Sequence, residues 1–299
     1  MGKQPVKYYV VDAFTDEAFE GNPAAVCILE EEKDEKWMQA VAMEFNISQT
    51  CYLTRITDSA EVASSPRFHL RWFTPAAEVK LCGHATLATA YILFSKGFVK
   101  SSTIEFVTAS GILTAKKVPE IKKTNSSGDQ NGEAQESYLI ELNFPTVATI
   151  ECNDVDLVLV SKALGGADIV DLRRIIPTDD LFVVLQSSKA VAELQPQLDE
   201  MLKCPGRGIT VSAVAPPDSG FDTYSRSFYP KMGIKEDPVC GSAHCAVIPY
   251  WSKKLGKCDF KAYAASSRSG ILYIHLDEQS QRVLLRGKAV AVMEGSIFV

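Results

Sequence analysis

The sequence predicts an α+β fold built from two similar halves, and an internal repeat is the first observation behind this prediction. The first copy of the repeat contains Arg71-Trp72-Phe73-Thr74-Pro75, Cys82-Gly83-His84-Ala85, Gly97 and Ser110-Gly111-Ile112-Leu113. The second copy contains Arg226-Ser227-Phe228-Tyr229-Pro230, Cys240-Gly241-Ser242-Ala243, Gly256 and Ser269-Gly270-Ile271-Leu272. Matching elements lie 155, 158 or 159 residues apart, which a duplication with two short insertions explains. Two copies of one unit predict two facing domains, each of which brings one cysteine to a site between them.

The second observation is that each half has many short strand patterns and one apolar helix, which is typical of α+β folds and not of alternating βαβ units. Residues 83–95 are rich in Ala, Leu and Ile and contain no proline, so they predict a helix that is buried all round and ends at Gly97. A turn is expected at Glu20-Gly21-Asn22-Pro23. The elements expected in the first half are strands at 6–13, 24–29, 51–56, 67–73, 103–107, 111–118 and 138–143, and helices at 34–45 and 83–95.

The second half repeats this rhythm, with helices expected at 155–163 and 189–203 and a buried helix at 241–255. The nearly apolar-free segment 120–136 predicts an unstructured hairpin tip. Residues 145–152 are the expected linker. We therefore divide the chain into an N-terminal half, 1–147, and a C-terminal half, 148–299, whose last strand is allowed to pack back on the first half.

Size and composition narrow the class of protein. A chain of 299 residues suits two domains of about 150 residues each. The net charge of −6 and the scattered Lys and Arg residues argue against a nucleic-acid partner. No apolar run approaches the ~20 residues that span a bilayer, and the first residues lack the apolar segment of a secretory signal. Eight irregularly spaced cysteines indicate reduced thiols, so we expect a cytoplasmic protein without membrane contact. No Gly-rich phosphate loop follows an expected strand, so no nucleotide cofactor is expected.

Cys82 and Cys240 are the strongest candidates for chemistry, because each stands directly before the glycine that opens an apolar helix. A helix N-terminus presents unpaired N–H groups and the positive end of the helix dipole. It is expected to lower the pKa of the thiol and to hold a substrate carboxylate, which the small Gly83 and Gly241 allow to approach the backbone. The alternative is that both cysteines are buried small hydrophobes of the core.

Four motifs resemble those of the phenazine-biosynthesis PhzF-like family, within the diaminopimelate epimerase and proline racemase superfamily. They are Gly21-Asn22-Pro23, Asn46-Ile47-Ser48, Leu81-Cys82-Gly83-His84-Ala85-Thr86-Leu87-Ala88 and Glu236-Asp237-Pro238-Val239-Cys240-Gly241-Ser242-Ala243-His244. The resemblance implies two pseudo-symmetric domains, each a rolled, mostly antiparallel sheet around a central helix, with the active site in the inter-domain cleft. It also implies isomerase chemistry without a cofactor, often in a homodimer.

The resemblance assigns roles to the two cysteines and departs from the family at Gln49. Racemases and epimerases of the superfamily take a Cα proton with one cysteine thiolate and deliver a proton to the opposite face from a second thiol, and Cys82 and Cys240 match these positions. The phenazine enzyme uses instead a glutamate in the segment that matches Asn46-Ile47-Ser48-Gln49. The amide of Gln49 cannot act as a base near neutral pH. Gln49 is therefore expected to hydrogen-bond the substrate or to serve as a turn residue.

Three further residues match family positions. His84 resembles a histidine that contacts substrate, and it would orient a carboxylate or exchange a proton. Asp237 matches a site aspartate that would bind a substrate amine or hydroxyl or pair with His84, with a helix cap as the alternative. Ser242 would add an N–H and a hydroxyl for a carboxylate.

Other groupings near the motifs are weaker. His244 and Cys245 stand close to Cys240, but a structural metal site needs about four ligands and no second ligand pair is present, so no metal is expected. Glu44 and Glu78 are possible replacement bases that we expect to be solvated.

The sequence thus predicts an isomerase that removes and returns a proton at carbon of a small carboxylate substrate. One alternative is an allylic proton shift of the phenazine type with His84 or Asp237 as acid/base. The other is a non-catalytic protein that binds a small molecule.

Overall fold

A computed structural model describes residues 5–56, 65–120, 137–176 and 178–298. The first half contains β1 (Val6–Ala13), β2 (Asn22–Leu29), α1 (Glu35–Phe45), β3 (Gln49–Arg55), β4 (Arg67–Phe73), β5 (Glu78–Val79), α2 (Gly83–Ser95), β6 (Thr103–Thr108), β7 (Gly111–Pro119) and β8 (Tyr138–Pro145). The second contains β9 (Thr149–Glu151), α3 (Leu157–Ala163), β10 (Ile169–Ile175), β11 (Asp180–Leu185), α4 (Ser188–Ala192), α5 (Leu198–Met201), β12 (Ile209–Val214), β13 (Thr223–Tyr229), a 3₁₀ turn (Pro230–Met232), β14 (Ile234–Asp237), α6 (Gly241–Leu255), β15 (Asp259–Ala264), β16 (Gly270–Asp277), β17 (Arg282–Gly287) and β18 (Ala289–Ile297).

The two halves repeat the same strand order. The first runs β18–β1–β2–β3–β4–β6–β7–β8 and the second runs β9–β10–β11–β12–β13–β15–β16–β17. In both, the third and fifth pairings are parallel and the others antiparallel. This agreement, which extends over eight strands per half, is what a duplicated unit produces. The architecture is α+β, with long sheets and few helices, as predicted.

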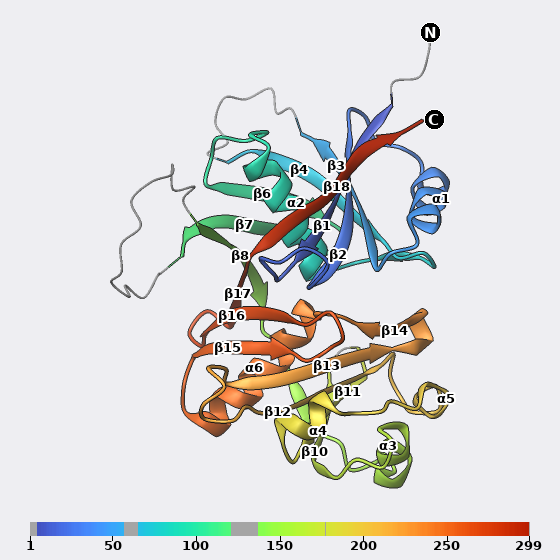
Figure 1. Cartoon of the computed structure of the whole chain (residues 1–299), viewed down its shortest axis with the longest axis vertical. Helices are drawn as coiled ribbons and strands as arrows, with labels where there is room; N and C mark the ends of the chain where they lie inside the picture. The colour runs from blue at the N-terminus through green and yellow to red at the C-terminus, as the bar shows by residue number, and fades with distance from the viewer. Residues whose placement is uncertain (1–4, 57–64, 121–136, 177, 299) are drawn as a thin grey trace.

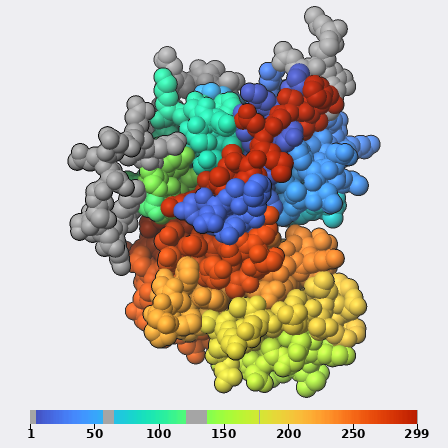
Figure 2. Space-filling view, viewed as in Figure 1, coloured from blue at the N-terminus to red at the C-terminus, as the bar shows by residue number. Residues whose placement is uncertain are grey.

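The halves are joined through neighbouring strands and by exchange of the chain. β8 pairs with β17 in antiparallel fashion and connects the two sheets. After β8 the chain crosses to the second half, where β9 pairs with β10. After β17 it returns, and β18 pairs with β1 along its whole length, from Ala289 beside Ala13 to Ile297 beside Val6. Figures 1 and 2 show this last strand lying across the first half.

A helix lies at the centre of each half. α2 contacts β1, β2, β3, β7, β8 and β18, and ten of its thirteen residues are buried. Its two threonines remain satisfied in this apolar setting because Thr86 and Thr89 donate their hydroxyls to the carbonyls of Cys82 and Ala85, at 2.6 and 2.8 Å. α6 takes the matching place against β16 and β17.

The structure differs from three local expectations. Residues 189–203 do not form one helix: α4 and α5 are separate, because Pro196 between them has no N–H and disfavours helical conformation in the residue before it. The linker 145–152 contains β9, and β2 begins at Asn22, inside the predicted turn. The hairpin tip predicted for 120–136 lies outside the described residues except for Glu120. The division at 147/148 stays a prediction.

Candidate active site

The N-termini of α2 and α6 meet at a cavity of about 640 Å³ that residues of both halves line. The contact is made by Gly83 and Gly241: a Cβ built on Gly83 would lie 3.6 Å from Cα of Gly241. The glycines therefore allow the two helix starts to approach each other closely. Neither helix is capped by a side chain, since Cys82 and Cys240 occupy the N-cap positions without a side-chain hydrogen bond to the helix. Unpaired N–H groups from two helices thus converge on one cavity, an arrangement suited to an anion.

Cys82 faces a histidine whose tautomer is set by its surroundings. Sγ of Cys82 lies 3.4 Å from Nδ1 of His84, and Nε2 of His84 lies 3.2 Å from Oγ of Ser48. Ser48 donates to the carbonyl of Pro23 at 2.6 Å, so its oxygen is left to accept from His84. The proton on His84 therefore belongs on Nε2, and Nδ1 is free to accept the proton of the Cys82 thiol.

Cys240 has a different set of partners. Its sulfur lies 3.6 Å from Oη of Tyr229 and 3.6 Å from Oγ of Ser242. Both hydroxyls can donate to a thiolate or accept from a thiol. Both cysteines line the cavity and are only 7% exposed. The first half therefore offers a thiol beside an imidazole, and the second a thiol beside two hydroxyls.

The expected lowering of the thiol pKa is wrong. Burial raises the pKa of Cys82 and outweighs the N–H group of Ala85, which acts in the opposite direction. Burial likewise raises the pKa of Cys240 to about 12, despite hydrogen bonds from Tyr229 and Ser242. Desolvation wins because it removes the water that would stabilise a thiolate. Burial also lowers the pKa of His84, so imidazole and thiols are all neutral at pH 7.

Asp237 is held by an asparagine and not by His84. Nδ2 of Asn22 donates to Oδ1 of Asp237 and to the carbonyl of Val239, the latter at 3.0 Å. Oδ1 of Asn22 lies 3.0 Å from Oγ of Ser48, so Asn22 connects Asp237 with the His84 side of the cavity. The predicted hydrogen-bonded pair of Asp237 with His84 is not present. Asp237 ends β14 and is not the cap of α6, whose N-cap residue is Cys240.

Gln49 lines the cavity and is 5% exposed. Its Oε1 atom is buried and accepts no hydrogen bond from any described residue. A buried acceptor without a partner costs free energy, on the order of 1–3 kcal/mol. Gln49 is therefore prepared to receive a donor group from a ligand.

The other candidates are exposed or are held by partners of their own. Glu44 is exposed on α1, outside the cavity lining. Glu78 lines the cavity but accepts two hydrogen bonds from Arg71, at 2.7 and 2.8 Å, as Glu236 does from Arg226 in the second copy of the repeat. His244 is 2.8 Å from the carbonyl of Cys240 through Nδ1, and no metal-binding group of three His, Cys, Asp or Glu residues occurs in the described ranges.

The sequence and the fold both match known proteins. The family model described as phenazine biosynthesis-like protein matches residues 11–295. The chain belongs to this family. An uncharacterized isomerase of Halalkalibacterium halodurans is 40% identical, with 97% of this chain and 98% of the relative covered. Phenazine biosynthesis-like domain-containing protein 2 of Mus musculus is 38% identical, again with 97% of this chain and 98% of the relative covered.

Solved structures agree with this assignment. A PhzF family protein of Enterococcus faecalis has a TM-score of 0.81 and 36% identity, with 99% of this chain and 100% of that chain covered. A probable proline racemase from Agrobacterium radiobacter has a TM-score of 0.62 at 11% identity, with 98% and 92% covered, which shows a shared fold. In the described part of this phenazine biosynthesis-like protein, no helix is long and apolar enough to cross a membrane.

The cavity thus brings together every predicted site residue: Cys82, Cys240, His84, Asp237, Gly83, Gly241, Ser242 and Gln49. Sequence reasoning assigned no role to Asn22, Ser48, Tyr229 or Arg207. Asn22 and Ser48 stand in quoted family motifs, and Tyr229 stands in the repeated Arg-x-Phe-x-Pro element, so a signal was present for these three. Arg207 follows an ordinary Pro205-Gly206 turn, and nothing in the sequence distinguishes it.

Proposed function

We propose that this protein is a cofactor-independent isomerase that removes a proton from carbon of a small carboxylate and returns one. Family membership supports the reaction class, because relatives from Halalkalibacterium halodurans and Pseudomonas aeruginosa are named isomerases. The observation that carries the proposal is the pair of thiols at the uncapped starts of α2 and α6 in one cavity.

In the proposed reaction the substrate carboxylate accepts hydrogen bonds from the N–H groups at both helix starts, with Gly83, Gly241 and Ser242 around it. Cys82 passes its proton to Nδ1 of His84, and the resulting thiolate takes the proton from the carbon beside the carboxylate. Cys240 then delivers its own proton to the opposite face of that carbon. The product has inverted configuration. At this point Cys82 carries the proton taken from the substrate, His84 carries an additional proton and Cys240 is a thiolate. After the product leaves, His84 releases its proton to solvent and Cys240 takes up one from solvent, which restores the starting state.

The buried setting is what makes these thiols useful bases. A thiolate that has lost its hydration holds a proton more strongly than one in water, so it is better matched to a weakly acidic carbon. The negative charge that develops on the substrate is stabilised by N–H groups that are already oriented toward it. Asp237 and the Oε1 atom of Gln49 would receive an amine or hydroxyl of the substrate.

The first test is incorporation of solvent deuterium into a library of amino, hydroxy and unsaturated carboxylic acids. Cys82→Ser and Cys240→Ser are each expected to slow labelling by about 100-fold or more, the scale of a lost acid/base group. Cys258→Ser, at a half-buried thiol outside the cavity lining, is the matched control. Label that persists in both cavity variants would move the chemistry to His84 or Asp237.

A second candidate is the allylic proton shift of the phenazine type, with His84 or Asp237 as acid/base. It is supported by the position of His84 and Asp237 in the cavity lining, where either could exchange a proton with a ligand. It needs one of these residues because Gln49 stands where the family resemblance places the glutamate, and an amide cannot act as the base. Gln49→Glu would then gain a diene isomerisation. No gain, together with no labelling by the unmodified protein, would favour a non-catalytic binding protein.

We further propose that the protein acts in the cytoplasm as a homodimer and needs no metal or cofactor. Light scattering gives the mass in solution. Labelling activity that survives dialysis against EDTA would support metal independence, and loss of activity restored by a metal would contradict it.

A further inference from the structure

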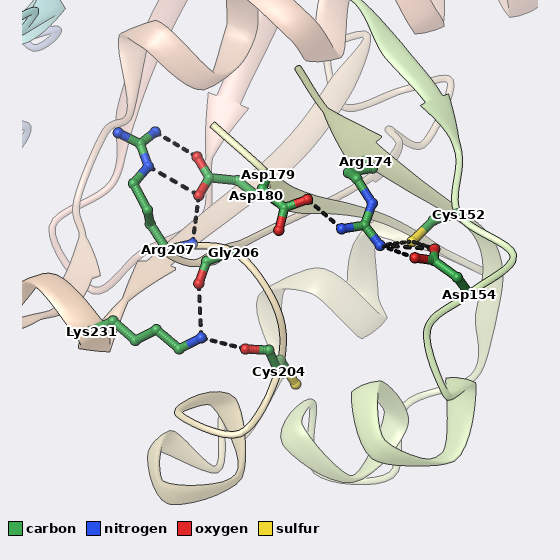
Figure 3. Close-up of polar contacts among 9 residues, drawn as sticks. All are labelled: Cys152, Asp154, Arg174, Asp179, Asp180, Cys204, Gly206, Arg207 and Lys231. Carbon is green, nitrogen blue, oxygen red and sulfur yellow. Dashed lines mark hydrogen bonds and ion pairs between the residues drawn. The ribbon is translucent and has the colours of Figure 1, made fainter. Parts of the chain in front are cut away.

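Arg207 brings a cation to the cavity from a segment that is remote in sequence from the family motifs. It stands two residues before β12 and lines the cavity with about half of its side chain exposed. Its backbone N–H and its side-chain atoms Nε and Nη2 donate to the carboxylate of Asp180, at 2.9, 3.2 and 2.6 Å (Figure 3). The side chain of Asp180 is 4% exposed, so this ion pair fixes the guanidinium at the cavity wall.

The ion pair uses only one edge of the guanidinium. Arginine has five N–H donors in a planar fork, and Asp180 takes Nε–H and one proton of Nη2. Nη1 donates to no residue in the described ranges, and Figure 3 shows it pointing away from Asp180. The edge formed by Nη1 and Nη2 thus remains open, and this edge matches a carboxylate in bidentate fashion.

A second group at the same end of the cavity also lacks a partner. Oγ1 of Thr178 is buried and makes no hydrogen bond to the described residues, although Thr178 lines the cavity. The loop of Thr178 is pressed against that of Arg207, because a Cβ on Gly206 would lie only 2.0 Å from the carbonyl oxygen of Asp179. A buried hydroxyl without a partner among the described residues, on a loop that packs against the loop of Arg207, indicates a missing ligand group.

This end of the cavity lies on the side of Cys240, the proposed proton donor. Gly208, which follows Arg207, leaves room for the ring of Tyr229, since a Cβ there would lie 2.4 Å from Cδ1 of Tyr229. Tyr229 in turn contacts Sγ of Cys240. The ring of Tyr229 thus lies between the backbone next to Arg207 and the sulfur of Cys240, and all three residues line the same cavity.

We infer that Arg207 and Thr178 form a second anion-binding subsite that takes the distal carboxylate of a short dicarboxylate substrate. The inference rests on the proposed function, in which the first carboxylate lies at the starts of α2 and α6. Arg207 then donates from Nη1 and Nη2 to the distal carboxylate, and Thr178 donates its hydroxyl to the same group. Asp180 orients the guanidinium without occupying the open edge.

The test compares acids of equal chain length by calorimetry on the unmodified protein: succinate against butyrate, glutarate against pentanoate, and adipate against hexanoate. At least one dicarboxylate is expected to bind about tenfold or more tightly than its monocarboxylate, since charge-assisted hydrogen bonds add roughly this much. Equal binding across all three pairs overturns the subsite.

Variants then locate the effect. Arg207→Gln is expected to reduce the preference to about twofold or less. Arg174→Gln keeps it: Arg174 forms the same kind of ion pairs with Asp154 and Asp179, but lies outside the cavity lining (Figure 3). If Arg207→Gln fails to fold because Asp180 loses its partner, Asp180→Asn combined with Arg207→Gln removes both charges together. A preference that survives in the folded variant overturns the inference.

The two proposals fail in different ways. Arg207-dependent binding of a dicarboxylate with no deuterium labelling of any acid would contradict the isomerase and support the subsite. Labelling of a monocarboxylate, with no preference for any dicarboxylate, would support the isomerase and overturn the subsite.

Discussion

At the scale of single residues, the hydrogen bond between Ser48 and His84 decides which nitrogen faces Cys82. Ser48→Ala removes the group that holds the proton on Nε2, so Nδ1 is less often free to accept from the thiol. We expect deuterium labelling to slow by roughly five- to tenfold, the worth of one hydrogen bond of about 1 kcal/mol. The ¹⁵N shifts of His84 are expected to move toward the other tautomer.

The second copy of the repeat offers a matched control. Ser225 lies 3.3 Å from Nε2 of His244, which is buried but does not line the cavity. Ser225→Ala is expected to leave the labelling rate within about twofold, since His244 contacts the backbone carbonyl of Cys240 and not its thiol. Equal slowing by both variants would mean that Ser48 acts through stability and not through His84.

The sequence predicted which residues meet in the cavity, but it predicted the pKa shifts of the thiols in the wrong direction. Cys82, His84 and Asp237 could be found because motifs and the repeat mark them. The direction in which the thiol pKa shifts could not be predicted. The start of a helix can be recognised in the local sequence, whereas desolvation of the thiol depends on the opposite half of the molecule. Arg207 was missed for a related reason: only the fold places its turn beside the cavity.

At the scale of elements, the close meeting of α2 and α6 predicts a specific disulfide. The helix starts touch at Gly83 and Gly241, and each carries its cysteine at the N-cap. Mild oxidation with diamide is expected to join Cys82 to Cys240 and to abolish labelling until a reductant is added. Peptide mapping checks the linkage, and crosslinks that involve the other six cysteines but never this pair would argue against a shared dithiol site.

The turn that presents Arg207 depends on one glycine. Gly206 has φ = +74°, and a Cβ there would lie 2.0 Å from the carbonyl oxygen of Asp179. Gly233 has φ = +78° but nothing within 4 Å of its Cβ position. Gly233→Ala should cost about 1–2 kcal/mol of unfolding free energy from backbone strain alone. Gly206→Ala should cost clearly more, because the backbone of a neighbouring loop must move, and urea unfolding measures the difference.

Elements were predictable where their signals are local. The helix starting after Asp34 and the apolar helix α2 follow from spacing and composition. β9 could not be predicted in this way, because it forms only where the chain crosses to the second half and pairs with β10. The same linker also supplies a hydrogen bond that α6 lacks. Pro249 has no N–H to donate to the carbonyl of Cys245, and the backbone N–H of Val147 donates to that carbonyl instead, at 2.9 Å.

At the scale of the whole molecule, two sets of buried groups limit the pH range of stability. The repeat could be recognised in the sequence, but the depth to which the facing halves bury their polar groups could not. Burial lowers the pKa of His84 and His244, so the unfolded chain takes up protons below about pH 6.5 and the folded protein does not. Stability from these groups is therefore present above pH 6.5 and is lost as the pH falls below it.

The thiols act in the opposite direction. Burial raises the pKa of Cys51, Cys240 and Cys245 to about 12, so these groups stay protonated in the folded state while they ionise in the unfolded chain above about pH 8.5. The folded state then binds more protons, and its stability falls as the pH rises, by up to about 1.4 kcal/mol per pH unit for each thiol.

Urea unfolding from pH 5.5 to 10 is therefore expected to give maximal stability between about pH 6.5 and 8.5. Cys51→Ala removes one buried thiol, so the free energy of unfolding should fall less steeply at alkaline pH, by up to about 1.4 kcal/mol per pH unit. Cys258→Ala is the matched control, since Cys258 is the one cysteine of eight that is not buried. An alkaline decline that is equally steep in both variants would mean that the buried thiols do not cause it. The burial of Cys51, which lies outside the cavity lining, would then carry no measurable cost for the fold at alkaline pH.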